Sequence, residues 1–355
     1  MRKNFVFWIH SIAGLLSGLF IFLLSLSGTA LVFHEDIDQF QQTHISQSGA
    51  YILPVDSSYD HLQKQYPHAQ ISSCSLPENA AEAFIFSIYD PSYKNGTAAL
   101  QVFLHPQTAG VLQTRGSKDI QNNFMGWLSV FHNSFQLGKT GEWMLGVFSL
   151  VFLISIITGI MLYRKNIGAV LTFKKAAFKK GNFHQIIGTW ALLFNLMIAV
   201  TGFWMQRYVF KKEFYSSTNY TSILRPSPPL FFHFDSAYAG VKKQYPDFTA
   251  RVIYFAQSGK GRTAVYGNNS TNSFIHSKEF ADAIFLDSTG KIVKKAFVNE
   301  IPAADRYDII NSQVHFGKYG GWPVKILYGF LGLAGGLLSI TGFLLWYKRK
   351  KALLT

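Results

Sequence analysis

The chain has 355 residues, 48% of them hydrophobic, and its mean hydropathy of +0.13 indicates membrane spans combined with sizeable soluble parts. Its net charge of +14 comes from 33 basic and 19 acidic residues, and twelve of the basic ones stand beside long apolar runs. The excess charge therefore marks membrane topology and argues against a nucleic-acid-binding face. The single cysteine, Cys74, excludes an internal disulfide and a cysteine-based metal site.

Four apolar segments are about twenty residues or longer, which is enough to cross roughly 30 Å of hydrocarbon. We expect these spans at residues 1–34, 143–163, 183–206 and 322–347. Lysine and arginine gather at the N-terminus, in the loop 164–182 and in the tail 348–355, which the positive-inside rule places in the cytoplasm. We therefore expect a multi-pass protein of a bacterial inner membrane with both termini in the cytoplasm.

The segments between the spans are predicted to fold on the outer side as two small α+β domains, at 35–122 and 207–303. Tyr66-Pro67 and Tyr245-Pro246 each follow a helix-like stretch, and glycine turns between apolar runs indicate hairpins further on. Each domain is followed by a stretch predicted to form an interfacial helix and a turn. These stretches are 123–142 and 304–321.

The two halves of the chain repeat each other. His10-x3-Gly14 opens the first span and His184-x3-Gly188 the third, at an offset of 174 residues. At an offset of 183, His132 and His315 precede the second and fourth spans. Small hydroxyl-Gly pairs follow the same two offsets: Ser27-Gly28, Thr158-Gly159, Thr201-Gly202 and Thr341-Gly342. The predicted fold class is thus a four-helix transmembrane bundle with two outer α+β domains and a pseudo-twofold internal repeat.

The repeat places one histidine of each half near each membrane face. His10 and His184 would form an inner pair, and His132 and His315 an outer pair. Two neutral imidazoles from different helices can supply both axial ligands of a haem iron, and helical bundles commonly hold such cofactors. A lone histidine would more often be a packing residue. Four in matching register favour two b-type haems with bis-histidine ligation over packing or a di-metal site.

Further residues were assigned to the haem sites by position. Gly14 and Gly188 lie one helical turn from the inner histidines, which would let a macrocycle approach each helix. Lys139 and Lys318, in matching Gly-Lys-x-Gly-x-Trp blocks, could pair with haem propionates or with lipid phosphates, and both interpretations remain open. His34 is the competing outer ligand, but Tyr208 stands at its repeat position, so the pairing favours His132.

Several common enzyme motifs are missing from the sequence. It contains no dinucleotide-binding G-x-G-x-x-G after a strand, no P-loop and no His-Glu-x-x-His metal motif. A chain that moved electrons would therefore receive them from a quinol or from a separate cytoplasmic reductase. We assign no catalytic residues.

Together, the His-x3-Gly openings, the Tyr-Pro repeats and the two His…Gly-Lys-x-Gly-x-Trp…Thr-Gly segments resemble the PepSY-associated transmembrane family over essentially the whole chain. That family includes iron-regulated inner-membrane proteins and FoxB-like siderophore reductases. The resemblance implies a membrane reductase that passes electrons through two haems to a ferric siderophore or other ferric chelate. It places the haem ligands at His10, His184, His132 and His315.

Two other functions were weighed against this one. The alternative is a non-enzymatic membrane protein whose PepSY-like domains bind peptides or regulate a protease. A siderophore permease is less favoured, because four helices leave little room for alternating access and the sequence shows no broken pair of helices.

Overall fold

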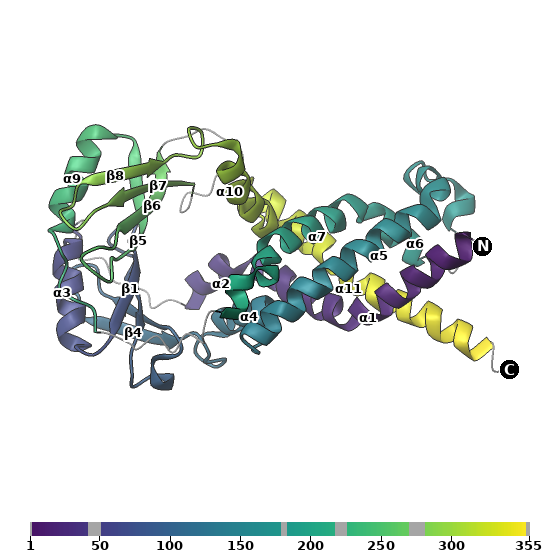
Figure 1. Cartoon of the computed structure of the whole chain (residues 1–355), viewed down its shortest axis with the longest axis horizontal. Coiled ribbons are helices and arrows are strands. Elements are labelled where there is room, and N and C mark those ends of the chain that lie inside the picture. Colours follow the sequence, from purple (N-terminus) through teal and green to yellow (C-terminus); the bar gives the residue numbers. More distant parts are fainter. Residues whose placement is uncertain (1, 42–50, 179–182, 217–225, 270–280, 353–355) are drawn as a thin grey trace. The chain divides into compact units, whose positions relative to one another are not determined.

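The computed structural model describes residues 2–41, 51–178, 183–216, 226–269 and 281–352 (Figure 1). These residues divide into two compact units, each described here by itself. The helical unit comprises Met1–Ile37, Leu128–Ser216 and Val314–Thr355. The sheet unit comprises Asp38–Trp127 and Ser217–Gln313.

Long apolar helices dominate the helical unit. Three of them are long and apolar enough to cross a membrane, and a bent pair supplies a fourth span if it is counted as one. Along the chain, the helices that lie wholly or partly in this unit are α1 (Arg2–Leu31), α2 (His34–Gln41), α4 (Phe124–Ser134), α5 (Lys139–Leu171), η2 (Lys175–Phe178), α6 (Phe183–Trp190), α7 (Leu192–Gln206), η3 (Arg207–Phe210), α8 (Lys212–Ser216), α10 (Ala303–Phe316) and α11 (Gly321–Ala352).

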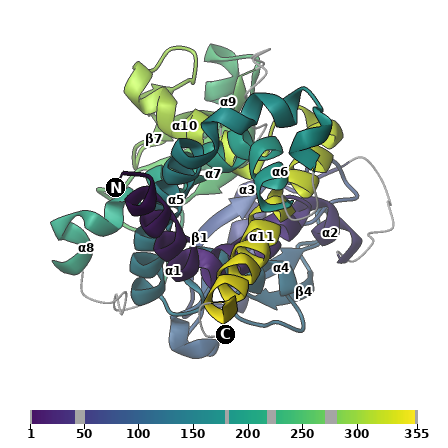
Figure 2. The same cartoon turned by 90° about the vertical axis from the view of Figure 1, so that its right-hand side faces the viewer.

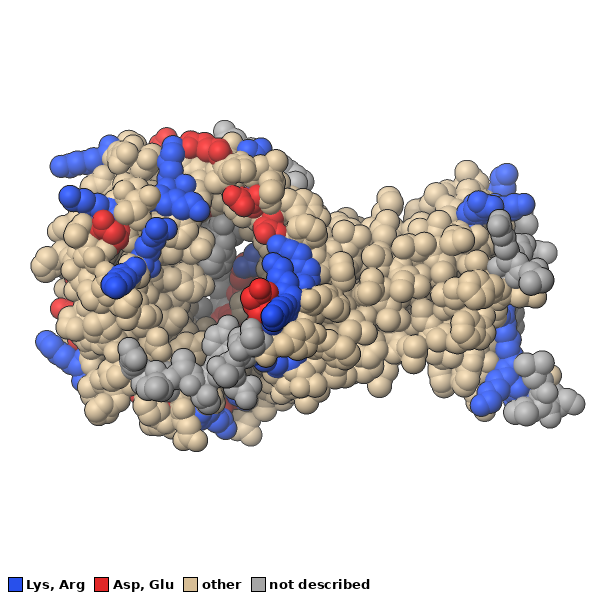
Figure 3. All heavy atoms as spheres, in the orientation of Figure 1, with Lys and Arg blue, Asp and Glu red and all other residues tan. Residues whose placement is uncertain are grey.

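Small residues let α1 pack closely along α11, while α5 lies on another side of α1 (Figures 1 and 2). Ser25 on α1 donates a hydrogen bond to the carbonyl of Gly332 and accepts one from the backbone N–H of Gly336 at 2.9 Å. Glycines on the facing helix make this approach possible, since a larger residue would hold the backbones apart. On the face drawn in Figure 3, acidic and basic side chains are missing from the middle of this unit and gather at its ends.

The third expected span, 183–206, does not form one continuous helix. α6 and the helical segment after it are bent by 65° at a short break. The backbone changes direction at Ala191 without a proline or glycine at that position. The lack of a visible broken pair of helices in the sequence was one argument against a siderophore permease. The break in the structure removes that argument.

Both segments between the spans contribute to a single eight-stranded antiparallel sheet. The expected picture of two separate α+β domains is corrected in this respect. In each segment a helix is followed by four strands. The first segment supplies α3 (Val55–Gln65), β1 (Gln70–Ser75), β2 (Phe84–Tyr89), β3 (Leu100–Leu104) and β4 (Val111–Gly116), with η1 (Lys94–Gly96) between β2 and β3. The second segment supplies α9 (Phe234–Gln244), β5 (Phe248–Tyr254), β6 (Thr263–Asn269), β7 (Asp282–Leu286) and β8 (Ile292–Ala296).

The two segments join where β1 pairs with β5, with Cys74 opposite Ile253, and the strand order is β4-β3-β2-β1-β5-β6-β7-β8. This pairing removes two exposed strand edges, which are otherwise prone to aggregation. The helices α3 and α9 lie on the same side of the sheet (Figure 1). Their apolar faces, including Tyr59, Leu62 and Val241, join the core of the sheet.

Cys74 is completely buried in that core, as expected for a small apolar residue. Burial raises the pKa of its thiol well above the ordinary value, so the thiol stays protonated and unreactive.

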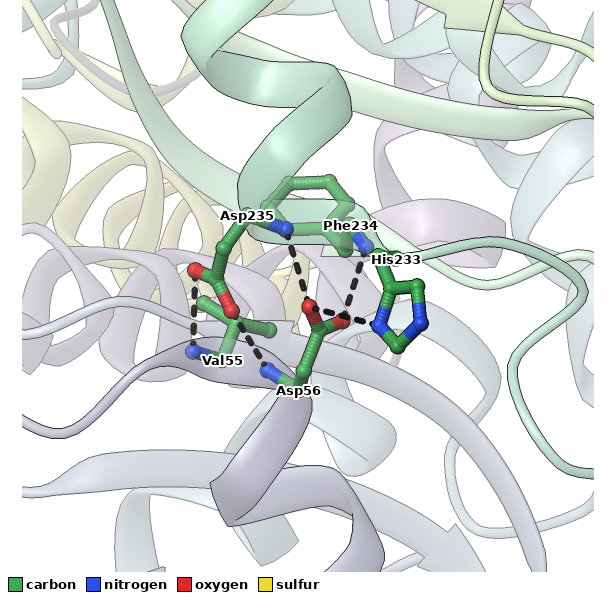
Figure 4. Close-up of polar contacts among 5 residues, drawn as sticks. All are labelled: Val55, Asp56, His233, Phe234 and Asp235. Atoms are coloured by element: carbon green, nitrogen blue, oxygen red, sulfur yellow. Dashed lines mark hydrogen bonds and ion pairs between the residues drawn. The ribbon is translucent and has the colours of Figure 1, made fainter.

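The helices α3 and α9 begin side by side and cap each other (Figure 4). The carboxylate of Asp56 accepts the backbone N–H groups of Phe234 (2.8 Å) and Asp235 (3.2 Å). In return, Asp235 accepts those of Val55 (3.1 Å) and Asp56 (2.8 Å). The first N–H groups of a helix have no partner within the helix, so each aspartate satisfies the other helix's start.

Candidate functional site

The inner pair of histidines is brought together in the helical unit. His10 comes from α1 and His184 from the short helix α6 before the break. Their ring centres are 6.2 Å apart and the ring planes are inclined by 72°. The two residues are 174 positions apart in the sequence, so this approach depends on the packing of helices from both halves of the chain.

Two groups on α5 hold the ring of His10. Its Nδ1 lies 3.0 Å from the carbonyl oxygen of Ser155 and 3.2 Å from the hydroxyl of Thr158. A carbonyl can only accept, so Nδ1 must carry the proton. Thr158 donates its own single proton to the carbonyl of Ile154 at 2.8 Å, so it too can act as an acceptor for the ring.

The ring of His184 is held by α11 in the same manner. Its Nδ1 lies 2.9 Å from the hydroxyl of Thr341, and the ring also bonds to the backbone of Leu338. Thr341 donates to the carbonyl of Leu337 at 2.8 Å, so its hydroxyl accepts from the ring. In both inner histidines Nδ1 is therefore the protonated nitrogen, and Nε2 keeps its lone pair.

The outer pair repeats this arrangement on other helices. Nδ1 of His132, on α4, lies 2.8 Å from the hydroxyl of Ser27 on α1. Nδ1 of His315, on α10, lies 2.9 Å from the hydroxyl of Thr201 on α7. Each hydroxyl has a backbone carbonyl four residues earlier at 2.8 Å to which it can donate. The same assignment follows: Nδ1–H donates and Nε2 retains a lone pair.

Both outer imidazoles are neutral near pH 7. Removal from water lowers the pKa of His132 to about 3, and the nearby ring of His315 lowers it further. Removal from water likewise lowers the pKa of His315 to about 4. His132 and His315 therefore lie within electrostatic range of each other. This proximity favours His132 over His34, which begins α2, as the partner of His315.

A glycine follows each hydroxyl residue and makes room for the imidazole. A Cβ built on Gly28 would lie 2.9 Å from Cε1 of His132, closer than real Cβ atoms come. The distances to the corresponding rings are 3.2 Å at Gly159, 3.2 Å at Gly202 and 3.4 Å at Gly342. We call each such pair a seat. The four seats are Ser27-Gly28, Thr158-Gly159, Thr201-Gly202 and Thr341-Gly342.

The sequence contained these pairs but did not reveal their role. On sequence alone, such pairs fit close helix packing or room for a haem equally well. The signal that could have identified them is numerical, because each seat has the same repeat offset as a histidine. The offset of 174 separates Ser27 from Thr201 and His10 from His184; the offset of 183 separates Thr158 from Thr341 and His132 from His315.

The other assigned residues lie elsewhere. A Cβ on Gly14 would meet Ser155 Oγ at 3.8 Å, and one on Gly188 would meet Leu338 Cδ2 at 3.5 Å, so ordinary contacts would suffice there. Lys318 forms an ion pair with Glu35 at 2.6 Å. Lys139 donates to the carbonyl of Phe214 at 3.1 Å and lies over that ring. Both lysines thus have partners within the protein, which weakens their assignment to haem propionates.

The histidine pairs satisfy several requirements of bis-histidine ligation. Two metal–nitrogen bonds of about 2.0–2.1 Å, plus about 1.1 Å from each nitrogen to its ring centre, separate the ring centres by about 6.3 Å. The inner pair has 6.2 Å. A ligating histidine also usually donates its other ring N–H to a fixed acceptor, as all four do here.

A metal ion held by protein side chains alone fits less well. Among the described residues, no group of three or more His, Cys, Asp or Glu side chains could hold one. Each pair offers only two nitrogen ligands, so the remaining ligands would have to come from a cofactor such as a porphyrin. The residues present therefore fit a haem.

The long apolar helices identify a membrane protein, and its helical unit brings together two pairs of anchored histidines. The chain belongs to the PepSY-associated transmembrane family: the model of the PepSY-associated TM region matches residues 7–349. This confirms the family that the sequence motifs indicated. A comparison with curated proteins found no match.

Proposed function

We propose that this protein is a di-haem transmembrane oxidoreductase that carries electrons across a bacterial inner membrane and reduces ferric siderophores or other ferric chelates on the outer side. The observation that carries the proposal is the fourfold occurrence of one arrangement. In each case a seat fixes a histidine through Nδ1 and leaves Nε2 able to bind a metal. Packing alone gives no reason for the same tautomer and support at four positions.

The two pairs would act at different depths in the membrane. On α1, His10 and the seat residue Ser27 are 17 residues apart, which corresponds to about 25 Å along a helix. That distance is most of the roughly 30 Å hydrocarbon core. We place the inner pair on the cytoplasmic side, with both termini, because basic residues stand next to it in sequence.

A haem iron bound between two such imidazoles would supply reversible one-electron chemistry. The chain itself supplies the ligands and the groups that orient them. His10 and His184 would hold the inner group, and His132 and His315 the outer one. The hydroxyls of the seats keep Nε2 free of a proton and fix each ring, which is how outer-shell partners tune a bound metal.

Electrons would enter at the inner pair, from a quinol or from a cytoplasmic reductase, and leave at the outer pair. Reduction suits the release of iron, because hard oxygen donors hold Fe(III) much better than Fe(II). We propose that the sheet unit helps to receive the ferric chelate. The seats, the tautomers and the ring separation support this function over a peptide-binding or protease-regulating role, which needs none of them.

The experiment is to purify the full chain from cells well supplied with haem, reduce it, and add a ferric hydroxamate chelate without oxygen. We expect a reduced b-type α-band that disappears as the chelate is added, while a colorimetric Fe(II) chelator captures ferrous iron. Haem that stays reduced in the presence of the chelate would contradict the reductase function. A colourless protein would instead support the non-enzymatic alternative.

A further inference from the structure

Tyr328 on α11 is a buried tyrosine, 3% exposed, whose hydroxyl lies in a directed chain of hydrogen bonds. It donates to the carbonyl oxygen of Val314 at 2.6 Å, because a carbonyl can only accept. Its distance to the hydroxyl of Tyr319 is 2.9 Å. Since Tyr328 has used its only proton, Tyr319 must be the donor of that second bond. The chain runs from Tyr319 through Tyr328 to Val314.

The carbonyl that ends this chain belongs to the peptide bond between Val314 and His315. The atoms of a peptide bond lie in one plane, so fixing the direction of this carbonyl also fixes the Cα of His315. The carbonyl lies in the last turn of α10, where carbonyls lack partners within the helix. Its only described backbone partner is the N–H of Gly317 at a long 3.4 Å.

The ring of Tyr328 fits closely beneath the turn that ends α10. Gly317 has a φ of +66°, and a Cβ there would come within 3.0 Å of the Tyr328 ring. The ring also packs edge to face against Phe194, with centres 5.0 Å apart. These two contacts hold the ring, and with it the hydroxyl against Val314.

The first half of the chain lacks this support. At the repeat offset of 183, the residue that corresponds to Tyr328 is Leu145, which has no hydroxyl. The carbonyl before His132, that of Phe131, accepts the ordinary helical bond from the N–H of Phe135 at 2.7 Å. His315 is therefore fixed at two points, the ring by Thr201 and the backbone by Tyr328.

We propose that Tyr328, oriented by Tyr319, is a positioning residue for His315 and makes the two ligands of the outer pair inequivalent. This inference rests on the proposed function, because it assigns Tyr328 to the outer haem site. Without the tyrosine hydroxyl, the His315 ring could turn about the end of α10. A change in the relative orientation of two axial imidazoles alters both the midpoint potential and the low-spin ferric spectrum of a haem.

The experiment compares the purified full chain with Tyr328→Phe and Tyr319→Phe by redox titration and by electron paramagnetic resonance. Tyr328→Phe keeps the ring and removes the hydrogen bonds of its hydroxyl, including the one to Val314, so we expect it to shift the potential and the spectrum of one haem only. Tyr319→Phe removes the bond between the tyrosines and keeps the one to Val314, so the same haem should shift by a smaller amount. His315→Ala identifies the affected haem as the outer one.

The outcomes separate the inference from the proposed function. A wild-type protein without haem overturns both. Two haems in the wild type with unchanged signals in Tyr328→Phe overturn the positioning role alone. Loss of both haems in Tyr328→Phe, together with unchanged signals in Tyr319→Phe, would show that the tyrosine serves only the fold and would also overturn it.

Discussion

The inner and outer histidine pairs use the same support on different helices. α1 carries the inner ligand His10 and also the outer seat Ser27-Gly28, while α5 carries the seat for His10. In the second half, α6 and α7 carry His184 and the seat for His315, while α11 carries the seat for His184. Each histidine is thus anchored within its own half of the chain, whereas the histidines pair between halves.

Anchoring a ring and pairing it with a second ring are therefore carried out by different contacts. Anchoring sets the tautomer and direction of each ring and depends on how helices of the same half pack. Pairing sets the distance between two rings and depends on how the halves pack. A change at a seat should therefore weaken one ligand, while a change at a histidine should remove one complete site.

The largest effect should come from removing a ligand. We expect His10→Ala to lose the inner haem and keep the outer one, and His315→Ala to do the reverse. The reason is that the two pairs share no histidine. His10 of the inner pair also lies about 25 Å along α1 from Ser27, which anchors His132 of the outer pair. Haem per chain, measured by the pyridine haemochrome method, should fall by half in each variant. Retention of both haems by either variant would refute the pairing.

The next largest effect should come from filling a seat. Gly28→Ala would place a methyl group 2.9 Å from Cε1 of His132, at a cost of roughly 1–3 kcal/mol. That corresponds to about 5- to 150-fold weaker retention of the outer haem. Gly18→Ala is the matched control, because nothing lies within 4 Å of the added atom. Equal haem retention in both variants would show that the seat does not constrain the ring.

Replacing Gly14 tests the earlier interpretation of that glycine. If a macrocycle lies against α1 there, Gly14→Ala should disturb the inner haem, although the protein contact it adds, at 3.8 Å, is an ordinary one. We expect a smaller loss of haem than for Gly28→Ala. An inner-haem spectrum identical to that of the wild type would assign Gly14 to helix packing alone.

A smaller effect should follow from removing a seat hydroxyl. Thr341→Val and Thr158→Val each remove one hydrogen bond to an inner histidine, worth about 0.5–1.5 kcal/mol. We expect Thr341→Val to shift the inner haem potential more, because its bond to His184 is shorter, 2.9 Å against 3.2 Å for Thr158 and His10. Redox titration of both variants measures the difference. A larger shift in Thr158→Val would reverse this ranking.

The smallest effect concerns the mutual caps of the sheet unit. Burial raises the pKa of Asp56, and the neighbouring carboxylate of Asp235 adds to the increase. The folded protein therefore holds a proton on Asp56 more tightly than the unfolded chain does. This group stabilises the fold most below its unfolded pKa, and the contribution is lost as pH rises through its folded pKa. Asp56→Asn should cost about 1 kcal/mol at low pH, through the lost cap bond.

The measurement is the difference in unfolding free energy between wild type and Asp56→Asn from pH 4 to pH 7. We expect this difference to become smaller as pH rises, because the variant has no carboxylate at that position to repel Asp235. A difference that grows with pH would mean that the ionised carboxylate of Asp56 is the better cap.

The sequence was informative where a residue pattern was continuous along the chain or repeated at a fixed offset. Long uncharged runs predicted the apolar helices, and the repeat offsets selected His10, His132, His184 and His315 from eleven histidines. The structure then placed His10 beside His184, and His132 within electrostatic range of His315.

Features that depend on packing between distant segments could not be predicted in this way. The pairing of β1 with β5 joins strands about 180 residues apart, and either strand alone looks like the edge of a small sheet. Ala191, where the helix breaks, is neither proline nor glycine, so local helix propensity gave no sign of the break. Likewise, a Thr-Gly pair in a span looks like a helix contact until a histidine is found against it.

The most direct test of the central claim is the amount of haem in the purified wild-type chain. The proposed function predicts two b-type haems per chain, one for each pair of anchored histidines, both low-spin in the ferric state because each iron would have two imidazole ligands. Pyridine haemochrome analysis against protein concentration, with electron paramagnetic resonance of the oxidised sample, measures both properties. Two low-spin haems per chain would support the account. A protein without haem, or with one haem that survives removal of any single histidine, would contradict it.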